Sequence, residues 1–215
     1  MKVKVRETVL VSGFEGFGEH CVNPSEQLAN KLQGATIDGF DVESVVLPVT
    51  FENAFQVLAS AIERVRPQFV FCVGQAGGSE AICVERVAIN ICDAAIADNA
   101  GHTPRSVPIE LRGPVAYWST LPVAPIVAAL SAAGLPATIS YSAGTFVCNQ
   151  VFYKLMRVLS HNPQTRGGFV HVPFLPEQAL QEGCASMSLE EMERGLRVAI
   201  RVTLVEHRAR ELGGR

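Results

Sequence analysis

The chain has 215 residues, of which 48% are hydrophobic and 18% charged, and its formal net charge is −3. This length and composition are typical of one folded domain with a substantial core, and we expect residues 1–215 to form a single domain. The sequence contains no dense patch of Lys or Arg, which argues against nucleic acid as a partner.

One long uncharged stretch, residues 113–153, has to be distinguished from a membrane segment. It is interrupted by Pro114, Pro122, Pro125, Gly134 and Pro136. No run of about 20 strongly apolar residues survives these interruptions, so we expect no membrane span. Residues 1–7 are charged and lack the apolar segment of a secretory signal, so we expect no export either.

Strands and helices are predicted to alternate along the chain. Asn23 and Pro24 fit the cap and first turn of a helix, and Ser188 with Glu191 fits the capping box of a long final helix to about Arg208. Strands are predicted near 8–13, 42–47, 68–73, 137–141 and 167–173, and further helices near 51–65, 125–134 and 147–159. Residues 81–92 are predicted as a strand or hairpin, and 93–113 as a long loop that can cover a cleft. This alternation favours an α/β fold with a mostly parallel sheet covered on both faces.

Cys148 is the strongest candidate for a reactive side chain. It lies in the segment Ser-Ala-Gly-Thr-Phe-Val-Cys-Asn at 142–149, where a strand is predicted to turn into a helix. The free N–H groups and the positive dipole end of a helix favour a thiolate and can hold an oxyanion. A free thiol, with a pKa of ~8.5, is mostly protonated at neutral pH, so a nucleophilic cysteine also needs a base.

Two other side chains are candidates to work with this thiol. His171 ends the apolar strand predicted at 167–173, and Glu85 lies inside a strand-like run at 84–90. In such a series the carboxylate orients the imidazole, the imidazole moves the proton, and the thiol attacks a carbonyl. Spacing along the chain does not show that the three side chains meet.

The remaining chemistry-bearing residues point to no cofactor. The six cysteines lack a C-x-x-C pair, and we expect most of them to be free thiols in a reducing compartment. There is no H-E-x-x-H zinc motif, and the glycine-rich segments 13–18 and 74–78 lack the order of a phosphate-binding loop.

Four segments together resemble the ordered motifs of the pyroglutamyl peptidase I family, also called pyrrolidone-carboxylate peptidases. They are Phe-Cys-Val-Gly-Gln-Ala-Gly-Gly at 71–78, Glu-Arg-Val-Ala-Ile-Asn at 85–90, the segment at 142–149, and Gly-Gly-Phe-Val-His-Val-Pro at 167–173. The resemblance runs from about Val9 to about His207. It implies a cysteine exopeptidase that removes an N-terminal pyroglutamyl residue from peptides through a thioester, with Cys148 as nucleophile, His171 as general base and acid, and Glu85 as third member.

The resemblance also implies the setting of the site. The expected fold is a single three-layer α/β/α sandwich with a mostly parallel, mixed, twisted sheet, without metal or organic cofactor, in a cytoplasmic protein that forms a homotetramer. Pyroglutamate is a neutral lactam, so its pocket should combine flat apolar walls with a few hydrogen-bonding groups. Matching positions that line or support this pocket are Phe14, Phe17, Asn23, Gln75, Ile96, Phe146 and Val147.

One departure from the family pattern concerns the pocket loop. The usual Phe-x-Pro-Phe-Gly has Gly16 in place of the proline, which should loosen the loop and affect substrate affinity more than chemistry.

Each candidate also has a purely structural interpretation. Taken alone, Cys148 fits a small buried residue, His171 a hydrogen-bonded core histidine, and Glu85 a carboxylate in an ion pair near Arg86. Phe14 and Phe17 alone fit core aromatics. Two other function classes stay open: a silent family member that binds lactam-capped peptides without cleaving them, and a nucleoside- or nucleotide-binding protein on a similar sheet.

Overall fold

A computed structural model describes residues 7–18 and 21–213 of the chain. Seven strands form one mixed sheet in the order β2-β3-β1-β4-β9-β5-β8. The sheet contains β1 (Thr8–Phe14), β2 (Thr36–Ile37), β3 (Phe40–Leu47), β4 (Phe69–Gln75), β5 (Ile82–Glu85), β8 (Ala137–Ser140) and β9 (Arg166–Val172). Strands β3, β1, β4 and β9 run parallel, whereas β5 is antiparallel to β9 and parallel to β8.

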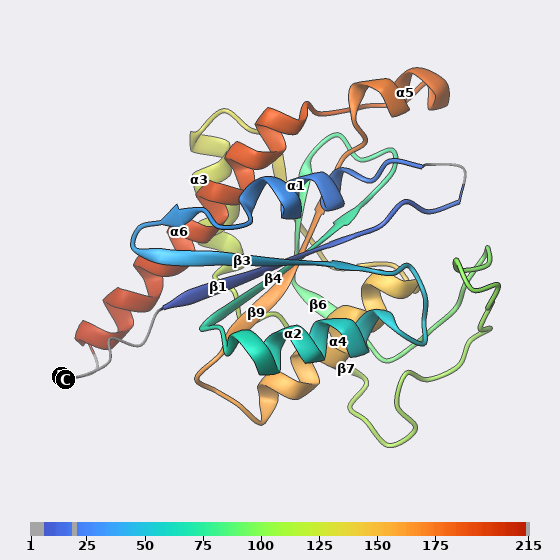
Figure 1. The fold of residues 1–215 in the computed structure, drawn as a ribbon, viewed down its shortest axis with the longest axis horizontal. Coiled ribbons are helices and arrows are strands. Elements are labelled where there is room, and N and C mark those ends of the chain that lie inside the picture. Colours follow the sequence, from blue (N-terminus) through green and yellow to red (C-terminus); the bar gives the residue numbers. More distant parts are fainter. Residues whose placement is uncertain (1–6, 19–20, 214–215) are drawn as a thin grey trace.

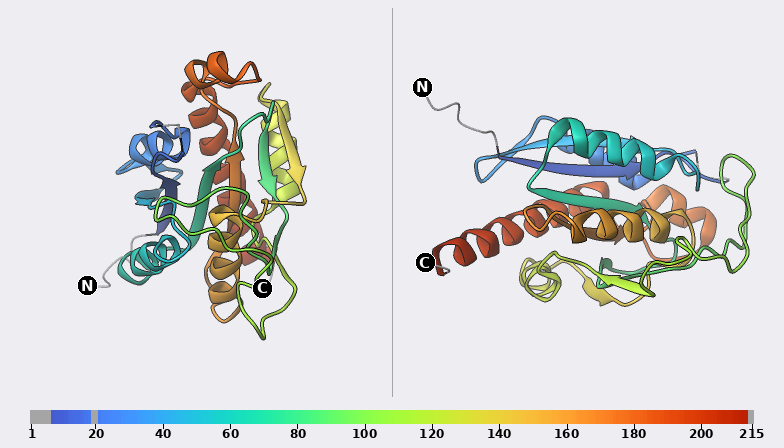
Figure 2. Two further views of the ribbon diagram at one scale, coloured as in Figure 1. Left: turned by 90° about the vertical axis from the view of Figure 1, so that its right-hand side faces the viewer. Right: turned by 90° about the horizontal axis from the view of Figure 1, so that it is seen from below.

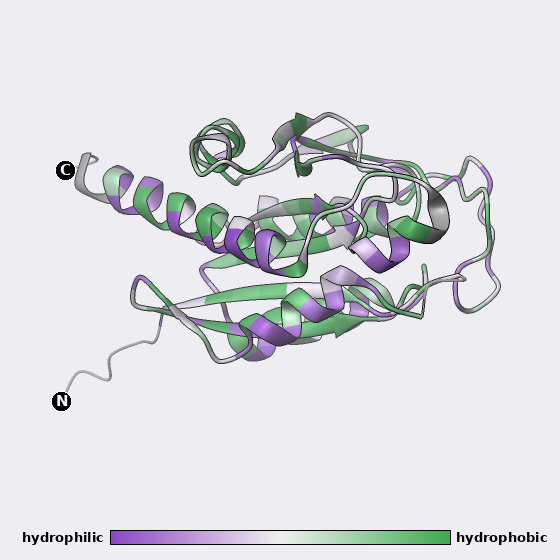
Figure 3. Ribbon diagram, turned by 90° about the horizontal axis from the view of Figure 1, so that it is seen from above, coloured by the Kyte–Doolittle hydropathy of each residue, from purple (hydrophilic) through white to green (hydrophobic). Residues whose placement is uncertain are grey.

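Helices cover both faces of this sheet (Figures 1 and 2). One face packs against α1 (Pro24–Leu32), α3 (Val123–Ala132) and α6 (Leu189–Gly213), and the other against α2 (Ala54–Val65) and α4 (Val147–Ser160). The two apolar clusters share the sheet between them, and Figure 3 shows the apolar strands enclosed by helices with mixed polarity. The expected α/β/α sandwich with a mixed, mostly parallel sheet is confirmed.

Local sequence signals explain where several helices begin. The Asn23 side chain accepts a hydrogen bond from the Ser25 N–H at 3.0 Å, and Pro24 occupies the first turn of α1. At the start of α6, the Ser188 hydroxyl accepts from the Glu191 N–H, and the Glu191 carboxylate accepts from the Ser188 N–H. Both predicted caps are therefore confirmed.

The segment 81–92 folds differently from a simple hairpin. It forms β5 and then β6 (Val87–Ile89), but β6 leaves the main sheet and pairs with β7 (Ala116–Trp118) in a separate two-stranded sheet. The loop predicted at 93–113 carries no helix or strand, and only an isolated bridge joins Cys92 to Val107. A short helix, α5 (Pro176–Glu182), follows β9 where no helix was predicted.

The structure describes helices of 7 to 25 residues. None of them is long and apolar enough to cross a bilayer.

Candidate active site

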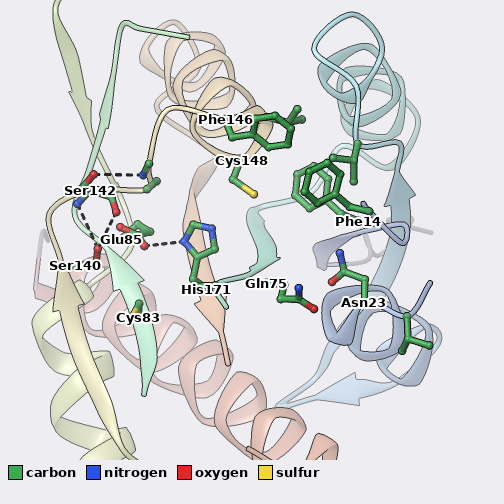
Figure 4. Close-up of a pocket in the computed structure, with 17 residues that line it drawn as sticks. Phe14, Asn23, Gln75, Cys83, Glu85, Ser140, Ser142, Phe146, Cys148 and His171 are labelled. Atoms are coloured by element: carbon green, nitrogen blue, oxygen red, sulfur yellow. Dashed lines mark hydrogen bonds and ion pairs between the residues drawn. The ribbon is translucent and has the colours of Figure 1, made fainter. Parts of the chain in front are cut away.

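A cavity of about 340 Å³ lies at the edge of the main sheet where β1, β4 and β9 end (Figure 4). Parallel strands present their carboxyl ends at one edge, which is where open α/β sheets commonly bind ligands. Among the described residues that line it, Glu85 and His171 are the only ones of the Asp, Glu, His, Lys and Arg types. The lining consists of Phe14, Phe17, Val22, Asn23, Val49, Gln75, Ala76, Cys83, Glu85, Ser140, Ser142, Ala143, Gly144, Phe146, Val147, Cys148 and His171.

Cys148 occupies the first turn of α4, as the sequence predicted. Gly144 has a positive φ of 74°, a conformation that favours glycine and lets the chain turn from β8 into the helix. The residue at the N-cap, Phe146, has no polar side chain to cap the helix, and the first bond within it runs from the Gln150 N–H to the Phe146 carbonyl at 3.2 Å. The first-turn N–H groups around Cys148 thus have no acceptor within the helix and can bind an anion.

Strand β4 makes room for the thiol through Gly74. A Cβ atom at this position would lie 3.1 Å from Cys148 Sγ and 2.9 Å from Cζ of Phe169. Both distances are shorter than ordinary non-bonded contacts of about 3.5–4.0 Å. The glycine therefore allows Cys148 to approach the sheet.

His171 and Glu85 come together because β5 and β9 are neighbours. The register places Cys83 opposite His171, so Glu85, two residues further along β5, projects from the same face of the sheet. The Glu85 Oε1 atom lies 2.8 Å from His171 Nδ1, and both side chains are almost completely buried. This hydrogen bond orients the ring so that its other nitrogen is available toward the cavity.

The charge state of His171 follows from its neighbours. Burial favours the neutral ring, but interactions of the ring with the neighbouring Cys148 and with the hydrogen-bonded Glu85 carboxylate raise the pKa of His171 to about 10. The imidazole is therefore protonated at neutral pH beside the sulfur. A cysteine sulfur, an imidazole ring and a carboxylate in series form the arrangement that activates a cysteine nucleophile.

Aromatic side chains form the walls of the cavity. Phe17 and Phe146 lie with ring centroids 5.0 Å apart, and Phe51 meets Phe146 edge-on at 5.2 Å. Phe14 is buried and packs on Phe169 below the cavity, with a centroid distance of 6.3 Å. Val147, the residue before Cys148, is buried and also lines the cavity.

Two carboxamides, Asn23 and Gln75, add hydrogen-bonding groups to this apolar surface. The Asn23 oxygen accepts from Ser25, and its nitrogen donates to the Glu15 carbonyl at 3.0 Å. The Gln75 oxygen accepts from the nitrogen of Gln178 at 2.9 Å. Both amides thus have their oxygen committed to a partner inside the protein.

The long loop after β6 is attached to the glycine-rich pocket loop. Asn99 donates to the Glu15 carboxylate at 2.8 Å and to the Gly16 carbonyl at 3.0 Å. Asp98 accepts from the backbone N–H groups of Phe51, Ala100 and the following His102 at 2.8–2.9 Å. The Gly16 segment is therefore held by side chains from outside it.

The structure brings together nine of the ten residues predicted for the site. Ile96 is the exception, because it does not line this cavity and its side chain is 57% exposed. The sequence analysis did not predict the remaining lining residues, which are Val22, Val49, Ala76, Cys83, Ser140, Ser142, Ala143 and Gly144. Cys83 had a usable signal, since it lies two residues before Glu85 and strand periodicity puts both on one face.

The site carries no sign of a metal centre within the described residues. No group of three or more His, Cys, Asp or Glu side chains is placed to hold a metal ion there. All six cysteines are free, and burial raises the pKa of Cys72 to about 12, so this second thiol near Cys148 stays protonated.

Fold and site together define a cysteine-type hydrolase, in which a thiol at a helix N-terminus and a histidine–carboxylate pair face a largely apolar cavity. A family model described as pyroglutamyl peptidase matches residues 7–206. A pyrrolidone-carboxylate peptidase of Bacillus cereus (strain Q1) is 48% identical over 211 residues, which cover 97% of this chain and 98% of that protein.

Solved structures agree with this match. The crystal structure of pyroglutamyl peptidase I from Bacillus amyloliquefaciens has a TM-score of 0.90 and 43% identity, covering 92% of this chain and 95% of that one. Pyrrolidone carboxyl peptidase from the hyperthermophile Pyrococcus furiosus has a TM-score of 0.89 and 40% identity, covering 93% and 99%. The chain belongs to the pyroglutamyl peptidase family and is an enzyme of the pyroglutamyl-peptidase I type.

Proposed function

We propose that this enzyme removes an N-terminal pyroglutamyl residue from peptides through a thioester, with Cys148 as nucleophile, His171 as general acid and base, and Glu85 as the residue that orients the imidazole. The observation that carries the proposal is the 2.8 Å hydrogen bond between Glu85 and His171, in a cavity that Cys148 also lines. The 215 residues would act as one peptidase domain.

In the acylation step, the Cys148 sulfur attacks the carbonyl carbon of the pyroglutamyl residue. The His171 imidazolium gives its proton to the nitrogen of the leaving peptide, and the C–N bond breaks to leave a thioester. Glu85 stabilises the charged ring before this transfer and holds its orientation throughout. The first-turn N–H groups of α4 are placed to bind the oxyanion of the tetrahedral intermediate.

In the deacylation step, the neutral His171 takes a proton from water as the water oxygen attacks the thioester carbonyl. The C–S bond then breaks, pyroglutamate leaves, and the thiolate–imidazolium pair is restored. Protons and electrons balance without metal or organic cofactor.

The polarity of the cavity supports a neutral lactam as the recognised group. Apart from the catalytic Glu85 and His171, the described lining residues carry no acidic or basic side chain, so no counter-ion is available for a charged N-terminal amine. The rings of Phe14, Phe17 and Phe146 provide flat apolar surface, and Asn23, Gln75 and nearby backbone groups provide hydrogen bonds. For Ile96 we propose a contact with the peptide outside the cavity, because its exposed side chain lies on the long loop attached to the pocket loop.

We also propose that the enzyme is a cytoplasmic homo-oligomer, with the tetramer as the expected state. Its free cysteines fit a reducing compartment. Exposed apolar side chains near β7, namely Leu111, Val115 and Trp118, offer contact surface for another subunit. Sedimentation equilibrium tests the assembly, and a monomeric mass would refute it.

A fluorogenic pyroglutamyl-coumarin amide tests the reaction and the nucleophile together. We expect Cys148→Ser to lose turnover while keeping affinity for a pyroglutamyl peptide, measured by calorimetry. Turnover at the parent rate in this variant would remove Cys148 as the nucleophile. A parent enzyme that binds the peptide without releasing the fluorophore would instead identify a binding protein.

A further inference from the structure

Gln178, on the short helix α5, forms three hydrogen bonds although it does not line the cavity. Its oxygen accepts from the Leu175 N–H at 3.0 Å, and its nitrogen donates to the Val22 carbonyl at 3.1 Å and to the Gln75 oxygen at 2.9 Å. The side chain is only 6% exposed. Every hydrogen-bonding direction at its amide is therefore close to saturated.

The orientation of Gln178 is fixed by backbone groups. The Leu175 N–H can only donate and the Val22 carbonyl can only accept, so the Gln178 oxygen must face Leu175 and its nitrogen must face Val22. In a flipped amide, the Gln178 nitrogen would face the Leu175 N–H, and the Gln178 oxygen would face the Val22 carbonyl oxygen. The remaining hydrogen on the Gln178 nitrogen then points at Gln75.

This fixed donor determines how Gln75 is oriented. Gln75 must turn its oxygen to Gln178, so its own amide nitrogen faces the cavity, as Figure 4 shows. Within the part of the chain that the structure describes, this nitrogen makes no hydrogen bond. The cavity therefore presents a neutral N–H donor that requires an acceptor on the ligand.

We propose that Gln178 is a positioning residue for substrate specificity, which holds the Gln75 amide as a hydrogen-bond donor to the carbonyl oxygen of the substrate's lactam ring. This inference rests on the proposed function. Of the two polar groups of the ring, the N–H cannot accept, so only the carbonyl matches Gln75. An N-terminal proline has a ring of the same size but no ring carbonyl, and it would leave the donor unpaired and bring a positive charge to it.

The test compares Gln178→Glu, Gln178→Met, Gln75→Leu and the two double variants, with Gln164→Glu as the matched control on an exposed glutamine outside the cavity lining. In Gln178→Glu the acceptor-only side chain should draw the Gln75 nitrogen toward itself and turn the Gln75 oxygen into the cavity. In Gln178→Met the Gln75 amide loses its fixed partner. Binding of 2-pyrrolidinone is measured by calorimetry, and KM and kcat are measured with the pyroglutamyl-coumarin amide.

We expect the 2-pyrrolidinone Kd and the substrate KM to rise together by about tenfold in both Gln178 variants, the effect of one lost hydrogen bond of about 1.4 kcal/mol, with little change in kcat. In the Gln75→Leu background the same substitutions should have no further effect, because there is no amide left to orient. Equal rises in both backgrounds would overturn the proposal and assign Gln178 a structural role. A loss confined to kcat, with the Kd unchanged, would also overturn it.

These outcomes are separate from the outcome of the proposed function. A parent enzyme without turnover refutes the peptidase proposal, whereas the calorimetric Kd still reports on the Gln178–Gln75 pair. A parent enzyme with turnover and additive Gln178 and Gln75 effects refutes only the positioning proposal. Thermal midpoints of all variants show whether α5 stays docked.

Discussion

The space that Gly74 leaves for the Cys148 sulfur leads to a specific prediction for Gly74→Ala. The added Cβ would lie 3.1 Å from Cys148 Sγ and 2.9 Å from Phe169 Cζ, so it overlaps each neighbour by roughly 0.5–1 Å. Phe169 is buried and cannot move freely, so the sulfur must shift. A misplacement of this size costs about 10²-fold in reactions that depend on alignment.

The matched control is Gly168→Ala on the neighbouring strand β9. Its Cβ would meet Ser119 Oγ at 2.3 Å and Leu121 at 2.9 Å, which are contacts away from the site. Both variants should lose about 1–3 kcal/mol of unfolding free energy through overpacking. Only Gly74→Ala should lose kcat and react more slowly with iodoacetamide at Cys148. A parent-like kcat in a folded Gly74→Ala enzyme would refute the proposed packing of the thiol against β4.

Three further predictions concern the charges and walls of the site. Glu85→Gln should lower the pKa of His171, so the alkaline limb of the kcat/KM profile, expected near the pKa of about 10 in the parent, should move to lower pH; an unmoved limb would contradict the pairing. Asp98→Ala should cost about 1–3 kcal/mol of unfolding free energy, because backbone donors lose their acceptor. Burial opposes the charged form of Asp98, but those hydrogen bonds outweigh it and hold the pKa of Asp98 below its usual value. This stability is therefore present above pH ~4 and is lost as pH falls through the lowered pKa. Denaturant melts test this: if the unfolding free energy changes between pH 7 and pH 3 by the same amount in the parent and the variant, the effect is excluded. Phe17→Ala should raise KM more than it lowers kcat, while a pure kcat loss would show that the ring acts only in the transition state.

The linkage for His171 has the opposite sign from that for Asp98. A folded-state pKa raised from 6.5 to about 10 stabilises the fold fully below pH ~6.5, and this contribution disappears as pH rises through about 10. This contribution to stability and the acid form of His171 that the proposed mechanism requires are therefore lost over the same alkaline range.

Local signals in the sequence were sufficient to predict the reactive segment. The strand-to-helix turn at 142–149, the cap at Asn23 and the box at Ser188 each depend on residues within a few positions of one another. The interactions that form these turns and caps lie within the same short segments, so the local sequence predicts them, and the structure confirms these elements.

Long-range partners could not be predicted in the same way. The Gln178–Gln75 bond spans 103 positions, and nothing in either glutamine specifies the other. The divergence of β5 from β6 also depends on distant strands, because β5 pairs with β8 and β9 while β6 pairs with β7. A run of alternating residues fits either arrangement, and tertiary contacts select one.

Buried amides, more than charges, join the segments that meet at the site. Asn149, next to Cys148, accepts a hydrogen bond from the Ile89 N–H and donates to the carbonyls of Ile89 and Ile91, and so connects α4 to the segment that follows Glu85. Asn23 ties the pocket loop to α1 in the same manner. A neutral amide exerts only a weak field, whereas an additional buried charge would shift the pKa of His171 and oppose or reinforce its pairing with the thiol. Anchoring by amides therefore fixes the geometry of the cavity while leaving its electrostatics to Glu85, His171 and Cys148, which agrees with the proposed binding of a neutral ring and reaction at an adjacent carbonyl.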